Sequence, residues 1–376
     1  MIKIILLMNP VYVTLFWAVV LSFYRSRKHA PKIFLGKFMF VASVLYISHY
    51  FYFTGQFAVY YYLDSIYTLA SLAVYPMYHI YVRMLTVDSE FSPSAHLKYL
   101  ALPVIVFLLH LTGYLLMNSS EAVYYLKMVL PGKESGQGIT GYMGIIYNLF
   151  RVVFICQVVI YLYLNYHLIS THNDQLQEFY SNIEERKLDW VQFFNFSLAV
   201  TSLASIFAAI LGRDIFNASD LHLAVPSAIF SVMLFIIGLL GNTQKEVYTE
   251  RLHHPEIKGK PKPSPIIKKK MERLFEQEMI FKSPDLKIWD LCKMLGTNRT
   301  YVSRMINSEY GRNFCNHVNH YRVEYAKKLI VETKQITNEE VAELSGFGSV
   351  NSLYRAFKSI EDKSLGEFRK ENQLRH

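Results

Sequence analysis

The sequence predicts an all-α protein in which a bundle of seven membrane-spanning helices precedes a water-soluble helical domain. Hydrophobic residues make up 52% of the 376 residues and charged residues only 18%, below the quarter typical of soluble domains. The charge is unevenly divided, since residues 1–241 contain 26 charged side chains with a net charge of +2, and residues 242–376 contain 43 with a net charge of +7. Beyond residue 265, long apolar runs give way to the spacing of amphipathic helices.

Seven apolar stretches are each long enough to cross a bilayer as a helix. About 20 residues, at about 1.5 Å per residue, span a hydrocarbon core of about 30 Å. Most stretches are bordered by Trp, Tyr, Lys or Arg, the residues that favour the water boundary. We therefore predict spans at approximately Ile4–Tyr24, Ile33–Phe53, Tyr60–Val82, Leu97–Met117, Tyr142–Tyr166, Trp190–Gly212 and Leu221–Gly241.

Positive charge near the span ends predicts the topology. The segment RSRKHAPK after the first span carries four basic residues, against the single Lys3 before that span. Alternation from this point places eight Lys and Arg residues on the inside and four on the outside, as the positive-inside rule requires. We expect the N-terminus outside and, after an odd number of spans, the C-terminal domain in the cytoplasm. The first apolar run is too long for a cleavable signal peptide and lacks a small-residue cleavage site.

Five polar side chains lie within the predicted spans. An ionisable group at membrane depth costs about 2.5–3.5 kcal/mol on insertion scales, which makes these side chains candidates for an intramembrane signal, relay or transport site. In the alternative interpretation, those near span ends reach water and the histidines are neutral and bonded to neighbouring helices. The sequence leaves both interpretations open for His49, Asp64, His79, His110 and Arg151.

Two loops are further candidates for receiving a signal. The predicted outside loop Asn118–Gly141 contains the flexible, polar run PGKESGQGITG, which either recognises a ligand or only connects two helices. The predicted inside loop His167–Leu188 has apolar residues at helical spacing, so we expect an amphipathic segment that lies on the membrane or docks on the cytoplasmic domain.

A polar linker follows the last span and separates three predicted regions, residues 1–241, 242–265 and 266–376. Between Pro255 and Pro265 the linker contains four prolines and a glycine, which exclude a regular helix. Fully extended, these residues reach about 35 Å. The linker lysines suit anionic lipid and DNA phosphate equally well.

The C-terminal region contains a helix-turn-helix pattern. A short helix at about Ile288–Leu295 ends at Gly296, and a second helix begins after the N-cap pair Thr297-Asn298 and continues to about Ser308. The side chains expected in the hydrophobic core of this pattern and of a second copy described next are Leu291, Leu295, Val302, Met305, Ile306, Val341, Leu344, Phe347, Leu353 and Phe357.

The pattern occurs a second time about 50 residues later. Thr337 and Glu340 form a T-x-x-E capping box ahead of VAELSGFGSVNSLYRAFK. Aligning the copies places Gly346 50 residues after Gly296 and Arg355 51 residues after Arg304. Between the copies, residues 313–331 are predicted to form one joining helix about 28 Å long. A repeat of this kind predicts two similar DNA-reading units.

Residues 268–371 resemble the DNA-binding domain of the AraC/XylS family of transcription regulators, most closely in the string SGFGSVNSLYRAFK. The sequence departs from the family at DKSLGEFR, where Asp362 replaces a glycine and Leu365 a proline. The resemblance implies that the second helix of each unit lies in the major groove, that the two units read successive grooves, that RNA polymerase is a partner and that the membrane is a bacterial inner membrane.

Eight side chains on these two second helices are expected to face DNA. Arginine suits guanine O6 and N7, and asparagine suits adenine N6 and N7, although each arginine can equally contact phosphate. In the first unit the candidates are Arg299, Thr300, Ser303 and Arg304, and in the second unit they are Val350, Asn351, Tyr354 and Arg355.

These observations favour a membrane-embedded, sequence-specific transcription regulator in which a signal reaches promoter DNA through the 242–265 connection. We expect no enzyme activity, cofactor or metal site, since no loop offers a nucleophile with a base, and the three cysteines lack ligand spacing.

One alternative is a transporter or membrane enzyme with an appended DNA-binding domain, whose five polar span residues would face one cavity. Another is a lipid or protein adaptor. The signal ligand, the promoter, activation or repression, and homodimer formation stay open.

Overall fold

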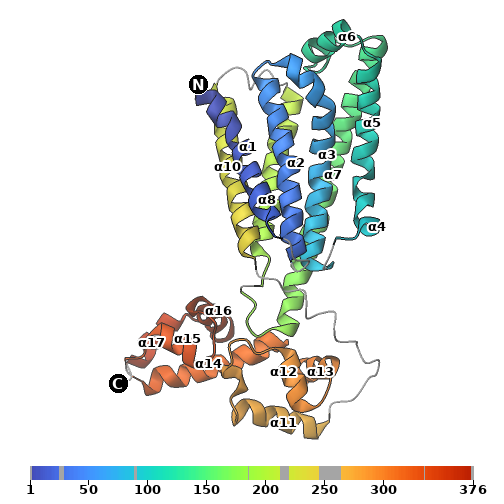
Figure 1. The fold of residues 1–376 in the computed structure, drawn as a ribbon. Coiled ribbons are helices and arrows are strands. Elements are labelled where there is room, and N and C mark those ends of the chain that lie inside the picture. The colour runs from blue at the N-terminus through green and yellow to red at the C-terminus, as the bar shows by residue number, and fades with distance from the viewer. Residues whose placement is uncertain are drawn as a thin grey trace. The chain divides into compact units, whose positions relative to one another are not determined.

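The computed structural model describes residues 2–24, 29–88, 91–184, 186–211, 220–244, 264–333 and 335–373. Within these ranges the secondary structure is helical, apart from an isolated antiparallel bridge between Tyr180 and Lys287. The chain divides into two compact bodies (Figure 1). Body 1 consists of Met1–Ser170 with Leu188–Tyr248, and body 2 of Thr171–Lys187 with Thr249–His376.

Long helices dominate body 1 and coincide with the seven predicted apolar stretches, although Gly212 of the sixth lies outside the described residues. In chain order these long helices are α1 (Ile2–Ser22), α2 (Ala30–Phe53), α3 (Phe57–Thr86), α5 (Ala101–Leu116), α7 (Gly138–Phe179), α8 (Asp189–Leu211) and α10 (Asp220–Thr243). Between them lie four short helices: α4 (Pro93–His96), the 3₁₀-helix η2 (Leu97–Leu100), α6 (Ser119–Tyr124) and the π-helix η3 (Tyr125–Val129).

Five helices among the described residues are long and apolar enough to cross a membrane. They contain the segments Ile4–Ser22, Ala30–Phe53, Pro93–Leu116, Gly138–Phe179 and Val225–Thr243. Helix α3 is not among them, because it combines many tyrosines with Asp64 and Arg83. More than half of its residues are buried inside body 1, so α3 contacts protein over much of its surface and does not need a wholly apolar exterior.

Body 1 is held together by close helix packing. Helix α1 packs against both α2 and α10, and α3 packs against α2 and α5. Gly238 on α10 lies so close to α1 that a Cβ atom there would overlap the indole ring of Trp17. Small residues allow such approach between apolar helices, where dispersion and shape complementarity provide the stabilisation.

One predicted loop contains the helical segment expected of it, and the other is more helical than expected. Helix α7 continues past the predicted span end at Tyr166 as far as Phe179, so the first half of the predicted loop His167–Leu188 is helical. The predicted flexible loop Asn118–Gly141 begins with a capping box, in which the Asn118 side chain accepts from the Glu121 amide. Buried Tyr125 and Leu130 then pack on neighbouring aromatic residues. Buried apolar residues in both loops explain the additional helix.

The described part of body 2 contains eight helices around two adjoining cores, drawn in orange and red in Figure 1. Helix α14 contributes residues to both cores. The predicted core residues are buried except Leu344, which is 51% exposed because it lies in the last turn of its helix. The helices are α11 (Pro265–Glu276), η5 (Ile280–Lys282), α12 (Ile288–Leu295), α13 (Arg299–Tyr310), α14 (Phe314–Glu332), α15 (Asn338–Leu344), α16 (Val350–Glu361) and α17 (Leu365–Gln373).

The backbone conformation at two turns of body 2 explains why residue 346 is a glycine and how Asp362 can stand where the family pattern has a glycine. Gly346 has φ +84°, and a Cβ there would lie 2.6 Å from the Lys282 backbone, so only glycine fits. After the recognition helices, Gly311 and Asp362 end α13 and α16 with φ +62° and +54°. Aspartate tolerates this left-handed conformation better than most residues, so Asp362 keeps the turn that glycine makes in the first unit.

Candidate DNA-binding interface

Helix α13 presents the first set of predicted DNA-facing side chains. Its N-cap Asn298 accepts a hydrogen bond from the Tyr301 amide at 2.9 Å, which fixes the start of the helix. One face, including Val302 and Met305, is buried in the first core. Arg304 is exposed on another face, and the remaining candidates Arg299, Thr300 and Ser303 are partly exposed. The helix is therefore anchored by its apolar face and leaves polar groups accessible.

Helix α16 repeats this arrangement in the second unit. Its N-cap Ser349 accepts from the Ser352 amide at 3.1 Å. Leu353 and Phe357 are buried, whereas the candidates Asn351, Tyr354 and Arg355 are exposed. Val350, the fourth candidate, is partly buried against the second core and contributes packing as well as any contact with a base.

Arg322, at the centre of α14, is a functional residue that the sequence analysis missed. The side chain is 1% exposed, and its guanidinium donates to the carbonyl oxygens of Phe281 at 2.8 Å and Ser283 at 2.7 Å. It also lies 5.6 Å from the ring centroid of Phe347 in the second unit. Burial lowers the pKa of Arg322 to about 10, so the group stays charged at neutral pH. Arg322 thus connects the two helix-turn-helix units.

A sequence signal for Arg322 exists in its spacing. Val318 and Ala326 lie four residues to either side and are both buried, so Arg322 is on the buried stripe of the helix. An arginine on such a stripe is rarely buried unless its donors are satisfied. The carbonyl acceptors come from residues about 40 positions away, which the spacing alone does not reveal.

His317 is a second buried polar residue of α14. It is 1% exposed, and its ring centroid lies 4.6 Å from that of Tyr310 and 5.0 Å from that of Phe275. Neither ring nitrogen has a hydrogen-bond partner within the described parts of the chain. Burial lowers the pKa of His317 to about 4, so the ring is neutral and acts as an aromatic core residue.

In body 1, the described contacts bring together two of the five predicted intramembrane residues. Asp64 is 2% exposed and accepts hydrogen bonds from the hydroxyl groups of Tyr60 and Tyr114, both at 2.7 Å. His110 Nε2 lies 3.6 Å from the same carboxylate, and its Nδ1 lies 3.0 Å from the Ser65 hydroxyl. The carboxylate is therefore buried but well supplied with donors.

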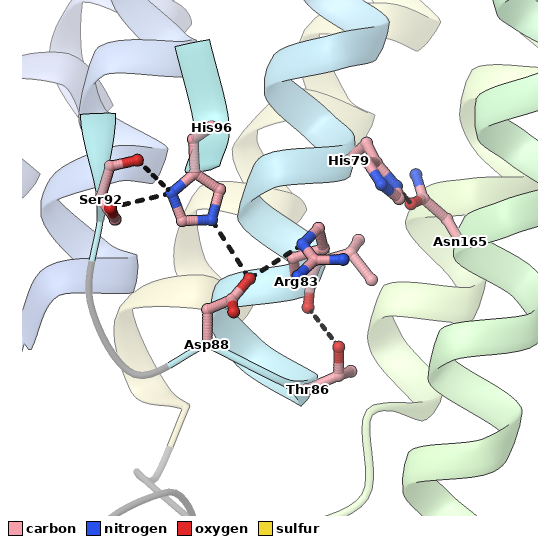
Figure 2. Close-up of polar contacts among 8 residues, drawn as sticks. His79, Arg83, Thr86, Asp88, Ser92, His96 and Asn165 are labelled. Carbon is pink, nitrogen blue, oxygen red and sulfur yellow. Dashed lines mark hydrogen bonds and ion pairs between the residues drawn. The ribbon is translucent and has the colours of Figure 1, made fainter. Parts of the chain in front are cut away.

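The other three predicted residues contact different partners. His79 Nδ1 lies 2.7 Å from the Asn165 side-chain oxygen (Figure 2). His49 Nε2 lies 3.2 Å from the Tyr67 hydroxyl. Arg151 lies 6.0 Å from the ring centroid of Tyr147, one helical turn away on α7. These three contacts involve neither one another nor Asp64 and His110, and a shared intramembrane site stays a prediction.

A polar cluster at the end of α3 was not predicted. Figure 2 shows Asp88 between Arg83 and His96. Its carboxylate oxygen lies 2.8 Å from Arg83 Nε and 3.1 Å from His96 Nε2. The other ring nitrogen of His96 lies 2.9 Å from the Ser92 carbonyl oxygen. The cluster therefore joins the end of α3 to α4.

Neither a metal nor a redox centre is found in the part of the chain that the structure describes. No group of three His, Cys, Asp or Glu side chains is close enough to hold a metal ion there. Cys292 and Cys315 are buried in body 2, and burial raises the pKa of each thiol to about 11. These thiols are protonated at neutral pH and pack as small apolar groups.

Comparison with known proteins identifies the C-terminal region. A family model described as a helix-turn-helix domain matches residues 291–371, which include the first helix-turn-helix unit from Leu291 onward, the joining helix α14 and the second unit. The chain matches no curated protein and no solved structure. The chain therefore carries an AraC-type DNA-binding domain at its C-terminal end, preceded by a region with five candidate membrane-spanning helices.

Proposed function

We propose that the protein is a membrane-embedded, sequence-specific transcription regulator that binds promoter DNA with body 2. The observation that carries this proposal is the pair of recognition helices α13 and α16, each anchored by a buried face and each presenting exposed polar side chains, in a region that matches a helix-turn-helix family. DNA recognition requires such accessible donors and acceptors at the surface of a rigid helix.

The joining helix supports the reading of two successive major grooves. Helix α14 has 19 residues and is therefore about 28 Å long, close to the roughly 34 Å of one turn of DNA. Arg322 binds the Phe281 carbonyl, whose residue belongs to the first core, and contacts Phe347 of the second unit, which limits changes in the spacing of the two units. The net charge of +7 on residues 242–376 favours approach to the phosphate backbone.

The membrane arrangement is part of the same proposal. We propose that all seven long helices of body 1 cross the bilayer, with α3 largely enclosed by its neighbours, that the N-terminus is outside, and that body 2 is cytoplasmic. The unequal distribution of Lys and Arg residues supports this topology. The 242–265 linker is proposed to tether body 2, and its residues 245–263 lie outside the described residues.

Genome-wide mapping of the DNA bound by the intact, epitope-tagged protein tests this function. We expect a small number of discrete sites, because a tethered regulator reaches only DNA that approaches the membrane. Arg304→Ala and Arg355→Ala should each reduce occupancy of these sites by about tenfold, since a bidentate arginine to guanine contact contributes about 1–3 kcal/mol of discrimination.

Lys370→Ala is the matched control, because it removes one positive charge from an exposed position on α17, which is neither of the two recognition helices. Occupancy at the discrete sites should stay within about twofold of the unsubstituted protein. Enrichment that is spread evenly over the genome, or that is unchanged in both arginine variants, would rule out sequence-specific recognition by these helices.

A further inference from the structure

Body 2 includes a segment that is distant in sequence from the DNA-binding domain. The inserted segment, Thr171–Lys187, comprises the end of α7 and the chain that follows it. Leu176 and Tyr180 are buried, Tyr180 forms the bridge to Lys287, and the Ser181 amide donates to the Leu286 carbonyl at 3.1 Å. The inserted segment is therefore packed as an integral part of body 2.

Side chains of α14 and its N-cap hold the base of the inserted segment. Arg322, in addition to its bonds to the first unit, donates to the Ser181 carbonyl at 3.3 Å and to the Ser181 hydroxyl at 3.1 Å. The Asn313 amide nitrogen donates to Gln177 Oε1 at 2.8 Å. The inserted segment thereby shares its anchoring residue with both helix-turn-helix units.

From this base, the inserted segment contacts DNA-facing residues of the first unit. The Glu178 carboxylate accepts from the Ser303 hydroxyl at 2.9 Å. The guanidinium of Arg299 lies 4.8 Å from the ring centroid of Phe179. Both Ser303 and Arg299 are among the side chains expected to approach DNA in the first unit.

The segment also contacts the second recognition helix. The Glu184 carboxylate accepts from the Ser349 hydroxyl at 2.9 Å and forms an ion pair of 2.5 Å with Arg355 Nη2. Asn182 lies against Gly348, where an added Cβ would be 3.2 Å from the Asn182 Cγ atom. One carboxylate therefore binds both the N-cap and the candidate guanine-reading arginine of α16.

We infer that the inserted segment is an autoinhibitory element that occupies the DNA-reading surface of body 2. Three of the eight candidate reading residues are already engaged, and the two carboxylates accept from the same donors that would otherwise contact phosphate or base oxygens. DNA binding then requires withdrawal of the segment. Since the segment continues directly from α7, a displacement of α7 provides the signal for release.

The inference rests on the proposed function, and a charge-neutral substitution tests it. The full-length protein in lipid nanodiscs is titrated with random-sequence duplex DNA long enough for two turns. Glu178→Gln with Glu184→Gln should increase the affinity about tenfold, within the roughly 5–150-fold range of coupled sites. The matched control, Glu324→Gln with Glu371→Gln, removes two carboxylates of body 2 that are paired with Lys327 and Lys363.

The control separates local competition from net charge, because both double variants make the protein more positive by two charges. An equal gain in affinity in both variants, or no gain in either, overturns the inference. A gain in the first variant only supports it.

A reversible crosslink provides the opposite manipulation. Asn182→Cys with Gly348→Cys places two thiols at a separation that a disulfide can bridge. The oxidised, locked protein should bind the duplex about tenfold more weakly than the same protein after reduction. Equal binding of the locked and reduced forms overturns autoinhibition while leaving DNA binding intact. If no form of the protein binds duplex DNA, the proposed function fails, and the inference fails with it.

Discussion

Body 1 and body 2 distribute polar and apolar side chains in opposite ways. In body 1 large apolar residues such as Leu115, Ile145 and Val159 are exposed, and the carboxylate of Asp64 is buried. In body 2 apolar residues form two cores and most charges face outward, with Arg322 as the principal buried charge. The comparison shows that the same requirement applies in both bodies: the buried carboxyl group of Asp64 accepts from hydroxyl donors, and the buried guanidinium of Arg322 donates to carbonyl acceptors.

The largest effect is expected when the buried charge of body 2 is removed. Arg322→Met leaves the carbonyl oxygens of Phe281 and Ser283 without their donors. Each buried acceptor left unpaired costs about 1–3 kcal/mol, so we expect a loss of about 3–5 kcal/mol in the stability of body 2. Hydrogen exchange of the α14 amides in the intact protein measures this loss. Lys328→Met, on an exposed position of the same helix, should change protection little, and a comparable loss there would contradict the assignment.

Removing the buried carboxyl group of body 1 should have a smaller effect. Asp64→Ala leaves the hydroxyl groups of Tyr60 and Tyr114 without their acceptor, and we expect a loss of about 2–3 kcal/mol. Thermal unfolding in detergent, followed by near-ultraviolet circular dichroism of the tyrosines, measures it. Thr112→Val on the exposed side of α5 is the control. A variant as stable as the unsubstituted protein would show that the hydroxyl groups find other partners.

The neutral His317 predicts a pH dependence that is specific to body 2. The pKa of His317 in the folded state is about 4, below the ordinary value of 6.5, so the unfolded state binds more protons between these values. Stability is therefore greatest above pH 6.5 and decreases as the pH falls, by about 2 kcal/mol near pH 5. Hydrogen exchange of α14 at both pH values tests this.

His317→Gln is the comparison variant for the pH experiment, since its side chain does not titrate. The difference in stability between pH 7 and pH 5 should be smaller in this variant by about 2 kcal/mol, because the other titrating groups are unchanged. The same pH dependence in both proteins would mean that folding does not lower the pKa of His317.

The smallest effect is expected at the turn that differs between the two helix-turn-helix units. Asp362→Gly should stabilise body 2 by about 0.5 kcal/mol, because glycine adopts the observed φ of +54° without steric strain but has more freedom in the unfolded chain. Gly311→Asp should have the opposite sign, because it places aspartate at φ +62°. Chemical denaturation of body 2, monitored by Trp289 fluorescence, measures both, and two changes of the same sign would contradict the prediction.

Local patterns in the sequence were sufficient for many features of body 2. The turn glycine Gly296, the N-cap Asn298 and the capping box of Thr337 with Glu340 depend on residues within four positions, and the structure confirms each of them. The apolar stretches of body 1 likewise predict its long helices, because the length and composition of a stretch are sufficient to identify a candidate membrane-spanning helix.

The remaining features depend on partners that are distant in the chain. Arg322 is satisfied by carbonyl groups of the first unit and by Ser181, which is about 140 positions away. The Asp88 and His96 cluster requires the chain to fold back at the end of α3. The contact of Glu184 with Arg355 joins a predicted loop to a predicted DNA-reading helix. Periodicity contains no information about such pairings, and only the folded chain reveals them.

Helix α7 has a mechanical consequence for how a stimulus is transmitted. Its 42 residues contain no proline, and no glycine after Gly144, so the helix is uninterrupted for about 63 Å and includes residues of both bodies. Inserting one residue into α7 before Thr171 would turn the upstream part of the helix by about 100° relative to the inserted segment. The contact of Glu178 with Ser303 lies within body 2 and would be kept, so such an insertion would alter the response to a stimulus without replacing or separating any contact residue of the resting state.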